Sequence, residues 1–476
     1  MIKYYNKLSP RKKLFFENFF IYGFARIASK IVPIVALPIV TRLVPDTSVF
    51  GAFDLLNTIV SLGTAIAILG THDSMFRLFF ESEDLNYRQQ ICSTAFFMTL
   101  SSGVILFLFI VLIRNFISDI LFSSVAYGPY IILVSSEVFF GAALSPVATP
   151  TRMQNKRKIV IMMSLLVPAV TYSFSIPIIM FVDPLFGLIC GTLASNICSI
   201  IIYFTLNKKW FSFNYFQPKM IYPLFYIGLP LVPTFLIYWA YKTADRLMIN
   251  KLIGIEYNGI YAVGARVASV SQFIYTAFAG GWSYFAFSTM KDGDQVRMLS
   301  KIFERLLFVS IFSTGLAVLS AQYIFRLFFK GGYEDGYVVS PYLFLAPLLL
   351  MLFQTLGTQF LIIKKTWVVT LTLLLGALSN IALNYYLIPV LKIEGAGIST
   401  LFGYMLSVFI IAVVALKVGL LKVSGRVVIF LCMFLISWVL LRVQGLQQYY
   451  LLPVTVCCFA CLYYKDICTY VQRFLR

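Results

Sequence analysis

Charged residues are scarce in this chain, and histidine and the acidic residues are the scarcest. Only 12% of its 476 residues are charged, whereas soluble domains carry about 25%. The sequence holds 19 Asp and Glu and a single His, and no polar stretch is long enough to form a separate soluble domain. Hydrophobic residues make up 60% of the chain and the mean hydropathy is +0.88. This composition excludes an ordinary soluble protein and predicts a polytopic membrane protein.

Several signatures of enzymes and ATP-driven pumps are also missing. The chain has no Gly-Lys dipeptide, so it has no P-loop, and ATP-driven transport is excluded. His72 stands beside Asp73 in a segment predicted to be an inner loop, where a surface histidine is expected rather than a catalytic one. No nucleophile elbow or pair of catalytic carboxylates occurs in a polar loop. The protein is therefore expected not to be an enzyme and to need no cofactor.

Cysteine is present, but its placement does not fit a disulfide scaffold, because most of the eight cysteines lie inside apolar runs. The Cys457-Cys458-x-x-Cys461 cluster could form a metal or redox site. It has no histidine nearby, so free thiols embedded in lipid are the favoured interpretation.

Basic residues exceed acidic ones by 38 to 19. In a soluble protein this excess would indicate nucleic-acid binding. In a polytopic membrane protein, basic loops set the orientation instead, so no nucleic-acid partner is expected. The basic segment Met1–Lys13 precedes an apolar run that is too long for a signal peptide and lacks a cleavage site, which predicts an uncleaved anchor.

The apolar runs predict fourteen membrane-spanning segments, which must be helical because lipid cannot satisfy bare backbone groups. Their expected bounds are 15–43, 49–69, 92–113, 127–149, 159–181, 185–206, 221–244, 258–287, 303–324, 340–363, 367–390, 395–416, 427–443 and 449–464.

Loop charges predict the orientation of these segments. With the N-terminus inside, the inner segments carry 25 Lys and Arg, and the outer loops carry nine, among them Lys242 and Arg246. Because positive charge accumulates on the cytoplasmic side, both termini are expected to be cytoplasmic.

The first predicted span carries two cations at membrane depth. Arg26 and Lys30 are four residues apart, so they share one helix face. Each would cost about 2.5 kcal/mol or more if it faced lipid at the bilayer centre, so both are expected to face a water-filled cavity or a partner. Pro33 and Pro38 are expected to break the helix above them. A broken helix with two cations predicts a transporter for an anionic cargo.

The chain also repeats itself weakly. A proline-containing helix, an Arg-Leu turn and a helix that opens with glycine follow one another in the first two spans. The same order recurs in the seventh and eighth spans, so that residues 41–43 and 50–53 match residues 245–247 and 258–261. An Ile-Pro pair recurs near the outer ends of the fifth and eleventh spans. Proline-interrupted helices at matching places in two halves are typical of a transporter's central site.

Three stretches resemble the polysaccharide transporter family, the O-antigen and lipid-linked oligosaccharide flippases of the multidrug/oligosaccharidyl-lipid/polysaccharide exporter superfamily. They are residues 37–55, 228–267 and 376–401, with the patterns Thr-Arg-Leu-x-Pro…Gly, Asp-Arg…Gly-x-Tyr and Asn-x-x-x-Asn…Ile-Pro…Gly-Ala-Gly. The resemblance implies an all-α fold with two six-helix lobes in a V around a central cationic cavity. The corresponding domains are residues 1–208 and 209–420, followed by two additional helices and a short tail in 421–476.

The same resemblance implies a function and its partners. The protein would flip an undecaprenyl-diphosphate-linked oligosaccharide, such as an O-antigen unit of lipopolysaccharide, across the bacterial inner membrane by alternating access. A polysaccharide polymerase and a chain-length regulator would be its partners, beside the lipid bilayer itself.

Three cations are the candidate cargo ligands: Arg26, Lys30 and Arg266. A diphosphate needs two or more positive groups where water is scarce, and arginine offers two-pronged donors. The alternative is that these cations pair with buried acids, for which Asp54 and Glu137 are available.

A coupling-ion site is a second hypothesis. Asn380 and Asn384 share a face of the eleventh span, and Asp245 and Thr400 lie in the seventh and twelfth regions. Such oxygen ligands suit Na⁺, whereas the alternative is that the asparagines only pair helices. Protonation of an acid such as Asp54, Glu137 or Asp245 is the competing coupling route.

Two other functions are weighed against the flippase. A drug or cation antiporter of the same superfamily would need acidic cavity residues, whereas the candidates here are mostly cationic. A membrane polysaccharide polymerase would expose a long outer loop with catalytic residues, and no outer connection here is long.

Overall fold

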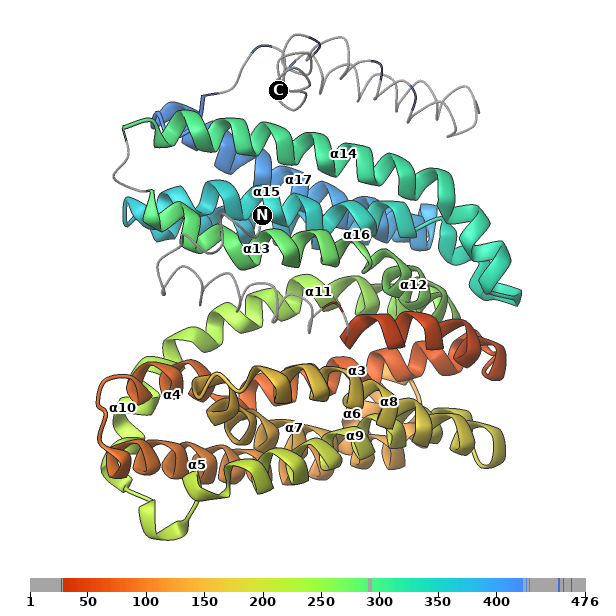
Figure 1. Cartoon of the computed structure of the whole chain (residues 1–476). Helices are drawn as coiled ribbons and strands as arrows, with labels where there is room; N and C mark the ends of the chain where they lie inside the picture. The colour runs from red at the N-terminus through yellow and green to blue at the C-terminus, as the bar shows by residue number, and fades with distance from the viewer. Residues whose placement is uncertain are drawn as a thin grey trace. The chain divides into compact units, whose positions relative to one another are not determined.

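The computed structural model describes residue 27, residues 29–289 and 293–422, and the single positions 425, 428, 453, 457 and 464 (Figure 1). The described residues are almost entirely helical and contain no strand. Among them, nine helical segments are long and apolar enough to cross a membrane. The prediction of an all-α polytopic membrane protein is therefore confirmed. The count of fourteen spans is not, because much of the first span and nearly all of the last two lie outside the described residues.

Most predicted spans coincide with a single helix. The second to sixth correspond to α3 (Thr47–Ile68), α5 (Leu85–Leu112), α7 (Gly128–Met153), α8 (Arg157–Phe181) and α9 (Pro184–Asn207). The ninth to twelfth correspond to α14 (Gln295–Phe328), α15 (Ser340–Ile362), α16 (Thr366–Leu391) and α17 (Ile393–Lys417).

The seventh and eighth spans are each divided into two helices. The seventh consists of α10 (Ile221–Gly228), a 3₁₀ turn over Leu229–Leu231 and α11 (Val232–Ile253). The eighth consists of α12 (Ile255–Ala268) and α13 (Ser271–Ser288). The break in the seventh span falls at Pro230, which has no backbone N–H to donate.

The expected proline break in the first span is wrong. Residues 29–43 form one continuous helix through Pro33 and Pro38. A proline inside a helix removes only the backbone hydrogen bond to the carbonyl four residues before it, here those of Ser29 and Ile34, and membrane helices tolerate such a loss without a break. The two proline-containing segments of the repeat therefore differ, since only the seventh span is broken.

Several of the scarce acidic residues cap helices. Asp46, Asp84 and Asp183 precede α3, α5 and α9, and each side chain accepts a hydrogen bond from a backbone N–H of the first turn. An acid at this position satisfies an orphan donor and faces the positive end of the helix dipole. These three acids therefore fix where helices begin, and they lie at helix ends rather than in the helix interiors.

Two short helices were not predicted, α4 (Thr71–Phe79) and α6 (Arg114–Phe122). His72 lies in α4 and not in a surface loop, which corrects the sequence interpretation. Its ring Nδ1 is 2.9 Å from the hydroxyl of Thr149, and the ring packs edge-to-face on Phe76. The reason for the error is that α4 continues the apolar course of α3 almost without a break, so that the residues after position 69 are still packed against other helices.

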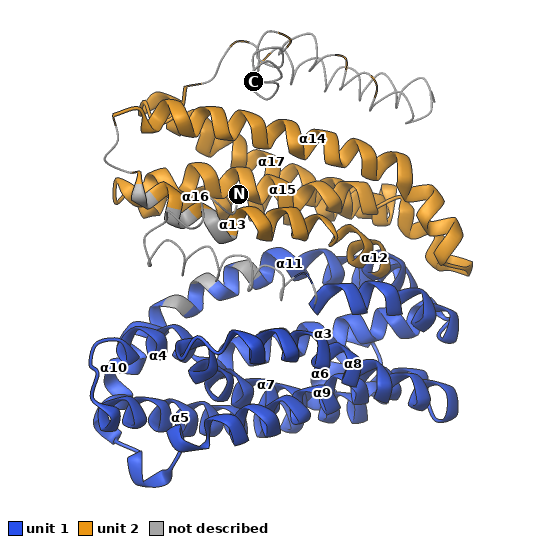
Figure 2. Ribbon diagram, viewed as in Figure 1, with its two compact units in different colours: residues 1–262 blue, residues 263–476 orange. Residues whose placement is uncertain are grey.

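The described chain divides into two compact units, Met1–Ala262 (unit 1) and Val263–Arg476 (unit 2), coloured in Figure 2. In unit 1, α7 is central and packs against α3, α5 and α9. In unit 2, α15 is central and packs against α13, α14 and α17. These central helices are the fourth and tenth predicted spans, six spans apart. The lobes expected at 1–208 and 209–420 follow the sequence repeat and stay a prediction.

Candidate functional site: a polar seam and its cavity

Helix α11 (Val232–Ile253) carries three charged residues in its interior, Lys242, Asp245 and Arg246. It has 22 residues, about 33 Å at 1.5 Å per residue. It is not among the nine apolar spans, because Lys242, Asp245 and Arg246 fall within any stretch long enough to cross. Lys242 and Arg246 were expected in an outer loop, and this is wrong because the helix continues to Ile253. Charges inside such a helix are costly unless they are paired or face water, and they mark function.

Arg246 pairs with Asp54 of α3. The distance from Arg246 Nε to Asp54 Oδ2 is 2.7 Å, and neither atom has an aligned hydrogen-bond partner. The short distance identifies an ion pair, while the missing alignment means that the N–H does not point along the line between the two atoms. The Arg246 side chain is 27% exposed and that of Asp54 is 7% exposed. The acid is thus the more deeply buried partner.

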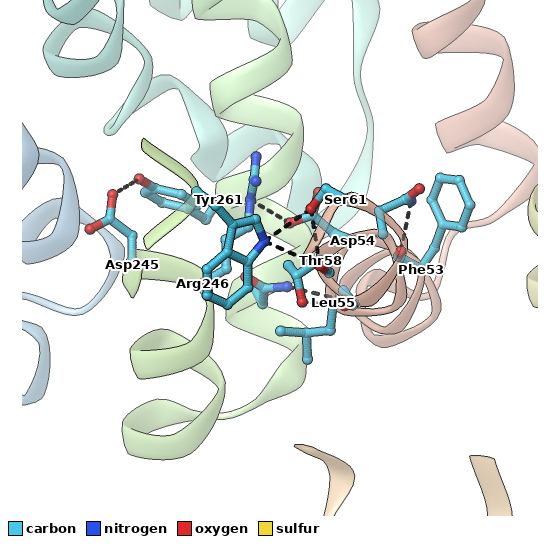
Figure 3. Close-up of polar contacts among 12 residues, drawn as sticks. Phe53, Asp54, Leu55, Thr58, Ser61, Asp245, Arg246 and Tyr261 are labelled. Carbon is cyan, nitrogen blue, oxygen red and sulfur yellow. Dashed lines mark hydrogen bonds and ion pairs between the residues drawn. The ribbon is translucent and has the colours of Figure 1, made fainter. Parts of the chain in front are cut away.

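Other polar contacts of α3 lie on the same face as Asp54 (Figure 3). Trp239 of α11 donates its indole N–H toward the Thr58 carbonyl at 3.2 Å and the Ser61 hydroxyl at 3.1 Å. Asn258 of α12 donates to the Gly51 carbonyl at 3.0 Å. Positions 51, 54, 58 and 61 are spaced by three or four residues and so form one stripe. We call this stripe and its partners Arg246, Trp239 and Asn258 the polar seam.

At one end of the polar seam two helices cross with no side chain between them. A Cβ built on Gly51 would lie 2.1 Å from the carbonyl oxygen of Ile255. A Cβ built on Gly259 would lie 1.9 Å from the carbonyl oxygen of Thr47. Each glycine therefore faces the carbonyl four residues before the other glycine. This reciprocity is that of a two-fold contact, and the two glycines occupy matching places in the sequence repeat. Glycine is required at both positions because any larger residue would collide with backbone.

Beside the polar seam, unit 1 contains a cavity of about 700 Å³. Volumes of this order are usual for ligand sites. Its polar lining comprises one guanidinium, one carboxylate, two amides and three hydroxyls, from Arg246, Glu137, Asn57, Asn196, Thr58, Ser61 and Thr64. Glu137 is 3% exposed and accepts a hydrogen bond from the Thr192 hydroxyl. The cavity can therefore hold a ligand rich in hydroxyls that also carries an anionic group for Arg246.

The predicted cargo ligands are only partly described. Arg26 lies outside the described residues. Lys30, on the helix of residues 29–43, is half-buried and close enough to Lys242 for their charges to repel. Arg266 lies on α12 within unit 2 and is half-buried. The partner of Asp54 is Arg246, which was not a candidate.

The predicted coupling-ion residues lie in both units. In unit 2, the Asn380 amide donates to the Thr400 hydroxyl at 3.1 Å, and the Asn384 amide donates to the Asn380 side-chain oxygen at 3.3 Å. We call these three residues the amide cluster; it joins α16 to α17. Asp245 belongs to unit 1, is 3% exposed, and accepts a hydrogen bond from the Tyr261 hydroxyl at 2.7 Å (Figure 3).

No group of His, Cys, Asp and Glu suited to a metal ion occurs within the described ranges. Of the Cys457-Cys458-x-x-Cys461 cluster only Cys457 is described, and it is exposed, so the remainder of that hypothesis lies outside the described residues.

The residue that sequence reasoning missed is Arg246. Its signal was present, since Lys242 and Arg246 have the same four-residue spacing that singled out Arg26 and Lys30. It was missed because the predicted seventh span was ended at the first charged residues, which placed Arg246 in an apparent loop.

Long apolar helices define this chain as a multi-pass membrane protein. A family model described as "Polysaccharide biosynthesis protein" matches residues 39–329. The chain belongs to this polysaccharide biosynthesis family. No curated protein sequence matches it significantly.

Solved structures share the fold. The lipid II flippase MurJ in an inward closed conformation has a TM-score of 0.66 at 15% identity, covering 94% of this chain and 100% of that one. A point mutant of VcmN, a MATE transporter of Vibrio cholerae, has a TM-score of 0.62 at 12% identity, covering 85% and 97%. A MOP superfamily transporter from Pyrococcus furiosus has a TM-score of 0.56 at 13% identity, covering 85% and 93%. At these identities the similarity concerns the fold alone.

Proposed function

We propose that this protein translocates an undecaprenyl-diphosphate-linked oligosaccharide, a repeat unit of O-antigen or another surface polysaccharide, across the bacterial inner membrane. The polysaccharide biosynthesis family and the fold shared with a lipid II flippase support a lipid-linked cargo. The observation that carries the proposal is Arg246, which lines a cavity otherwise rich in amides and hydroxyls. A guanidinium matches a diphosphate in charge and geometry, and amides and hydroxyls match the sugars.

The diphosphate is held by several cations in this proposal. Arg26, Lys30 and Arg266 are retained as cargo ligands, and Arg246 is added to them. The proximity of Lys30 to Lys242 supports an anionic cargo, because two like charges at membrane depth are relieved when an anion binds between them.

Transport is coupled to an ion, Na⁺ or H⁺, with Asp245, Asn380, Asn384 and Thr400 as the coupling residues. Asp245→Asn is expected to weaken the ion dependence and leave folding intact. Transport in vesicles that survives removal of Na⁺ but stops when the proton gradient collapses would rule out the Na⁺ version.

Both termini are cytoplasmic in this proposal, and a polymerase and a chain-length regulator use the translocated units. A cysteine placed at Asn155 should react with a membrane-impermeant reagent only after the cells are opened. Labelling in intact cells would show that the orientation is inverted.

The function is tested in a strain that lacks the chain and carries well-expressed variants. Deletion should abolish surface polysaccharide while lipid-linked units accumulate inside. Arg26→Ala should do the same, and Arg26→Lys should restore only part of the output, because a point charge replaces a two-pronged donor. Loss of one charge-assisted contact costs about 1.5–3 kcal/mol, or more than tenfold in affinity. Normal polymer from an Arg26→Ala/Arg266→Ala double variant would show that these arginines are structural.

One observation favours a second function, a drug or cation antiporter of the same superfamily. Glu137 places a buried carboxylate in the cavity wall, where a cationic ligand could bind. This version expects Glu137→Gln to abolish efflux of a lipophilic cation from cells and to leave surface polysaccharide unchanged. The flippase proposal expects no such efflux in the first place.

A further inference from the structure

Arg246 belongs both to the polar seam and to the wall of the cavity. Through Nε it is held by Asp54 in the polar seam, and it also forms part of the wall of the cavity. Asp54 itself is not part of that wall. An anion in the cavity would therefore meet the same guanidinium that Asp54 holds.

Building on the flippase function proposed above, we propose that Asp54 is an internal competitor for the phosphate of the cargo. In the structure the Asp54 carboxylate occupies Arg246 and ties α3 to α11. A phosphate that enters the cavity takes over the guanidinium, releases Asp54 and opens the polar seam.

Opening follows from the burial of Asp54. A carboxylate whose side chain is only 7% exposed cannot stay charged without a partner or water. Once Arg246 turns to the cargo, Asp54 must either take up a proton or be hydrated, and in both cases the charge attraction that holds α3 to α11 is lost. The remaining contacts of the polar seam, from Trp239 and Asn258, are neutral hydrogen bonds, which hold membrane helices together only weakly.

The geometry also selects where the anion binds. Among the described residues of the cavity wall, Arg246 is the cation, whereas Glu137, the other ionisable group, is 3% exposed and offers a phosphate no positive charge. The phosphate therefore binds beside Arg246, and the hydroxyl-rich part of the cargo faces the amides and hydroxyls of the wall.

The direction in which Asp54→Asn changes the affinity for diphosphate distinguishes a competing role of Asp54 from a positioning role. Binding of inorganic diphosphate to the purified protein is measured by titration calorimetry in detergent. If Asp54 competes with phosphate, Asp54→Asn should tighten binding about tenfold, because the guanidinium is no longer occupied. If Asp54 instead orients Arg246 for the ligand, the same change should weaken binding, and the proposal is wrong. Arg246→Gln should abolish binding.

The exposed ion pair of Arg77 and Glu81 on the same unit provides matched controls. Their side chains are 70% and 48% exposed, so Glu81→Gln and Arg77→Gln remove the same charges without touching the polar seam. Both should leave the affinity for diphosphate unchanged. An equal tightening by Glu81→Gln would show a general charge effect and overturn the proposal.

A second measurement does not depend on whether the Asp54→Asn and Arg246→Gln variants fold. Thr58 is 4% exposed and belongs both to the polar seam and to the cavity wall, so a ligand that bound and left the polar seam closed would slow its reaction. In a variant without native cysteines, Thr58→Cys should react faster with a maleimide when diphosphate is added, because the polar seam opens. An unchanged or slower reaction in the presence of saturating diphosphate contradicts the proposal.

The source of the phosphate is resolved by comparing probes in nanodiscs. Farnesyl diphosphate in phosphatidylcholine should accelerate labelling of Thr58→Cys as inorganic diphosphate does. If phosphatidylglycerol alone accelerated this labelling, the site would bind membrane lipid, and the proposal that it binds the phosphate of the cargo would be wrong. Normal surface polysaccharide in the deletion strain would overturn the flippase function, whereas weaker diphosphate binding by Asp54→Asn would overturn only the competition between Asp54 and phosphate.

Discussion

The polar seam of unit 1 and the amide cluster of unit 2 both place polar side chains between helices, but they do so in opposite ways. The amide cluster is neutral and closed, with Asn380 and Asn384 fully buried and Thr400 at 6% exposure. The polar seam contains a charged pair, one member of which is 27% exposed in a cavity wall. The cluster joins two helices adjacent in sequence, whereas Asp54 and Arg246 are far apart in the chain.

The difference lies in charge. Neutral amides that are buried together hold two neighbouring helices, α16 and α17, through their mutual hydrogen bonds and place no charge in the interior. A charged pair is costly to bury and gains little over well-packed apolar residues. A pair whose cation borders a cavity can exchange partners, which is what the proposed competition with phosphate requires.

The largest effect should come from breaking the ion pair on one side only. Arg246→Ala leaves the Asp54 carboxylate buried without a partner, which should destabilise the protein by about 3–5 kcal/mol. The double variant Asp54→Ala/Arg246→Ala should recover most of this loss. Both are measured by thermal unfolding in detergent and by the yield of monodisperse protein. Equal stability of the single variant and the wild type would mean that water already reaches Asp54.

A smaller loss should follow from filling the glycine crossing. Gly51→Ala puts a methyl group against the backbone of Ile255, and overpacking of this kind costs about 1–3 kcal/mol. Gly357→Ala is the matched control, because its nearest neighbours would lie at an ordinary 3.6 Å. Unfolding temperatures decide the outcome; a Gly51→Ala protein as stable as Gly357→Ala would show that α3 and α12 do not cross this closely.

A modest effect is expected in the amide cluster. Asn380→Ala removes its bond to Thr400 and the acceptor for Asn384, and hydrogen bonds between membrane helices are worth on average about 0.6 kcal/mol each. A loss of about 1 kcal/mol is therefore expected, again from thermal unfolding. A loss as large as that of Arg246→Ala would erase the contrast between the two polar sites.

The smallest effect should come from the exposed pair. Arg77→Ala breaks the contact with Glu81, whose atoms are 3.8 Å apart in a solvated setting. Such pairs contribute about 0.5 kcal/mol or less. The unfolding temperature should stay within error of the wild type at low salt and at high salt alike; a clear salt-dependent loss would indicate that this pair belongs to a larger network.

The sequence predicted the helices well, because lipid forces every spanning segment to be apolar and helical. The second to sixth and ninth to twelfth spans coincide with observed helices to within a few residues, apart from the extended starts of α5 and α14. The prediction was wrong at the end of the seventh span, since α11 continues past Lys242 and Arg246, where the hydropathy of the sequence falls. Hydropathy measures the average cost of a segment, and a cavity lowers that cost for particular side chains.

The pairing within the site could not have been predicted in the same way. Asp54 was identified as an acid available to a buried cation, but which cation it meets depends on how α3 packs on α11. The matching glycine motifs at Gly51 and Gly259 indicated equivalent positions, and nothing in the repeat required the two to touch. Such contacts between distant segments need the three-dimensional arrangement.

The glycine crossing has a mechanical consequence for the polar seam. Two helices that meet backbone to backbone can rotate about that point without any side chain having to change its rotamer, so the crossing acts as a fulcrum. At 1.5 Å per residue, Asp54, Thr58 and Ser61 lie about 4.5, 10 and 15 Å along α3 from Gly51. A tilt of about 10° about the fulcrum moves these points by roughly 0.8, 1.8 and 2.6 Å. Once the ion pair is released, the Trp239 contacts therefore separate furthest, while Asp54, close to the pivot, moves least.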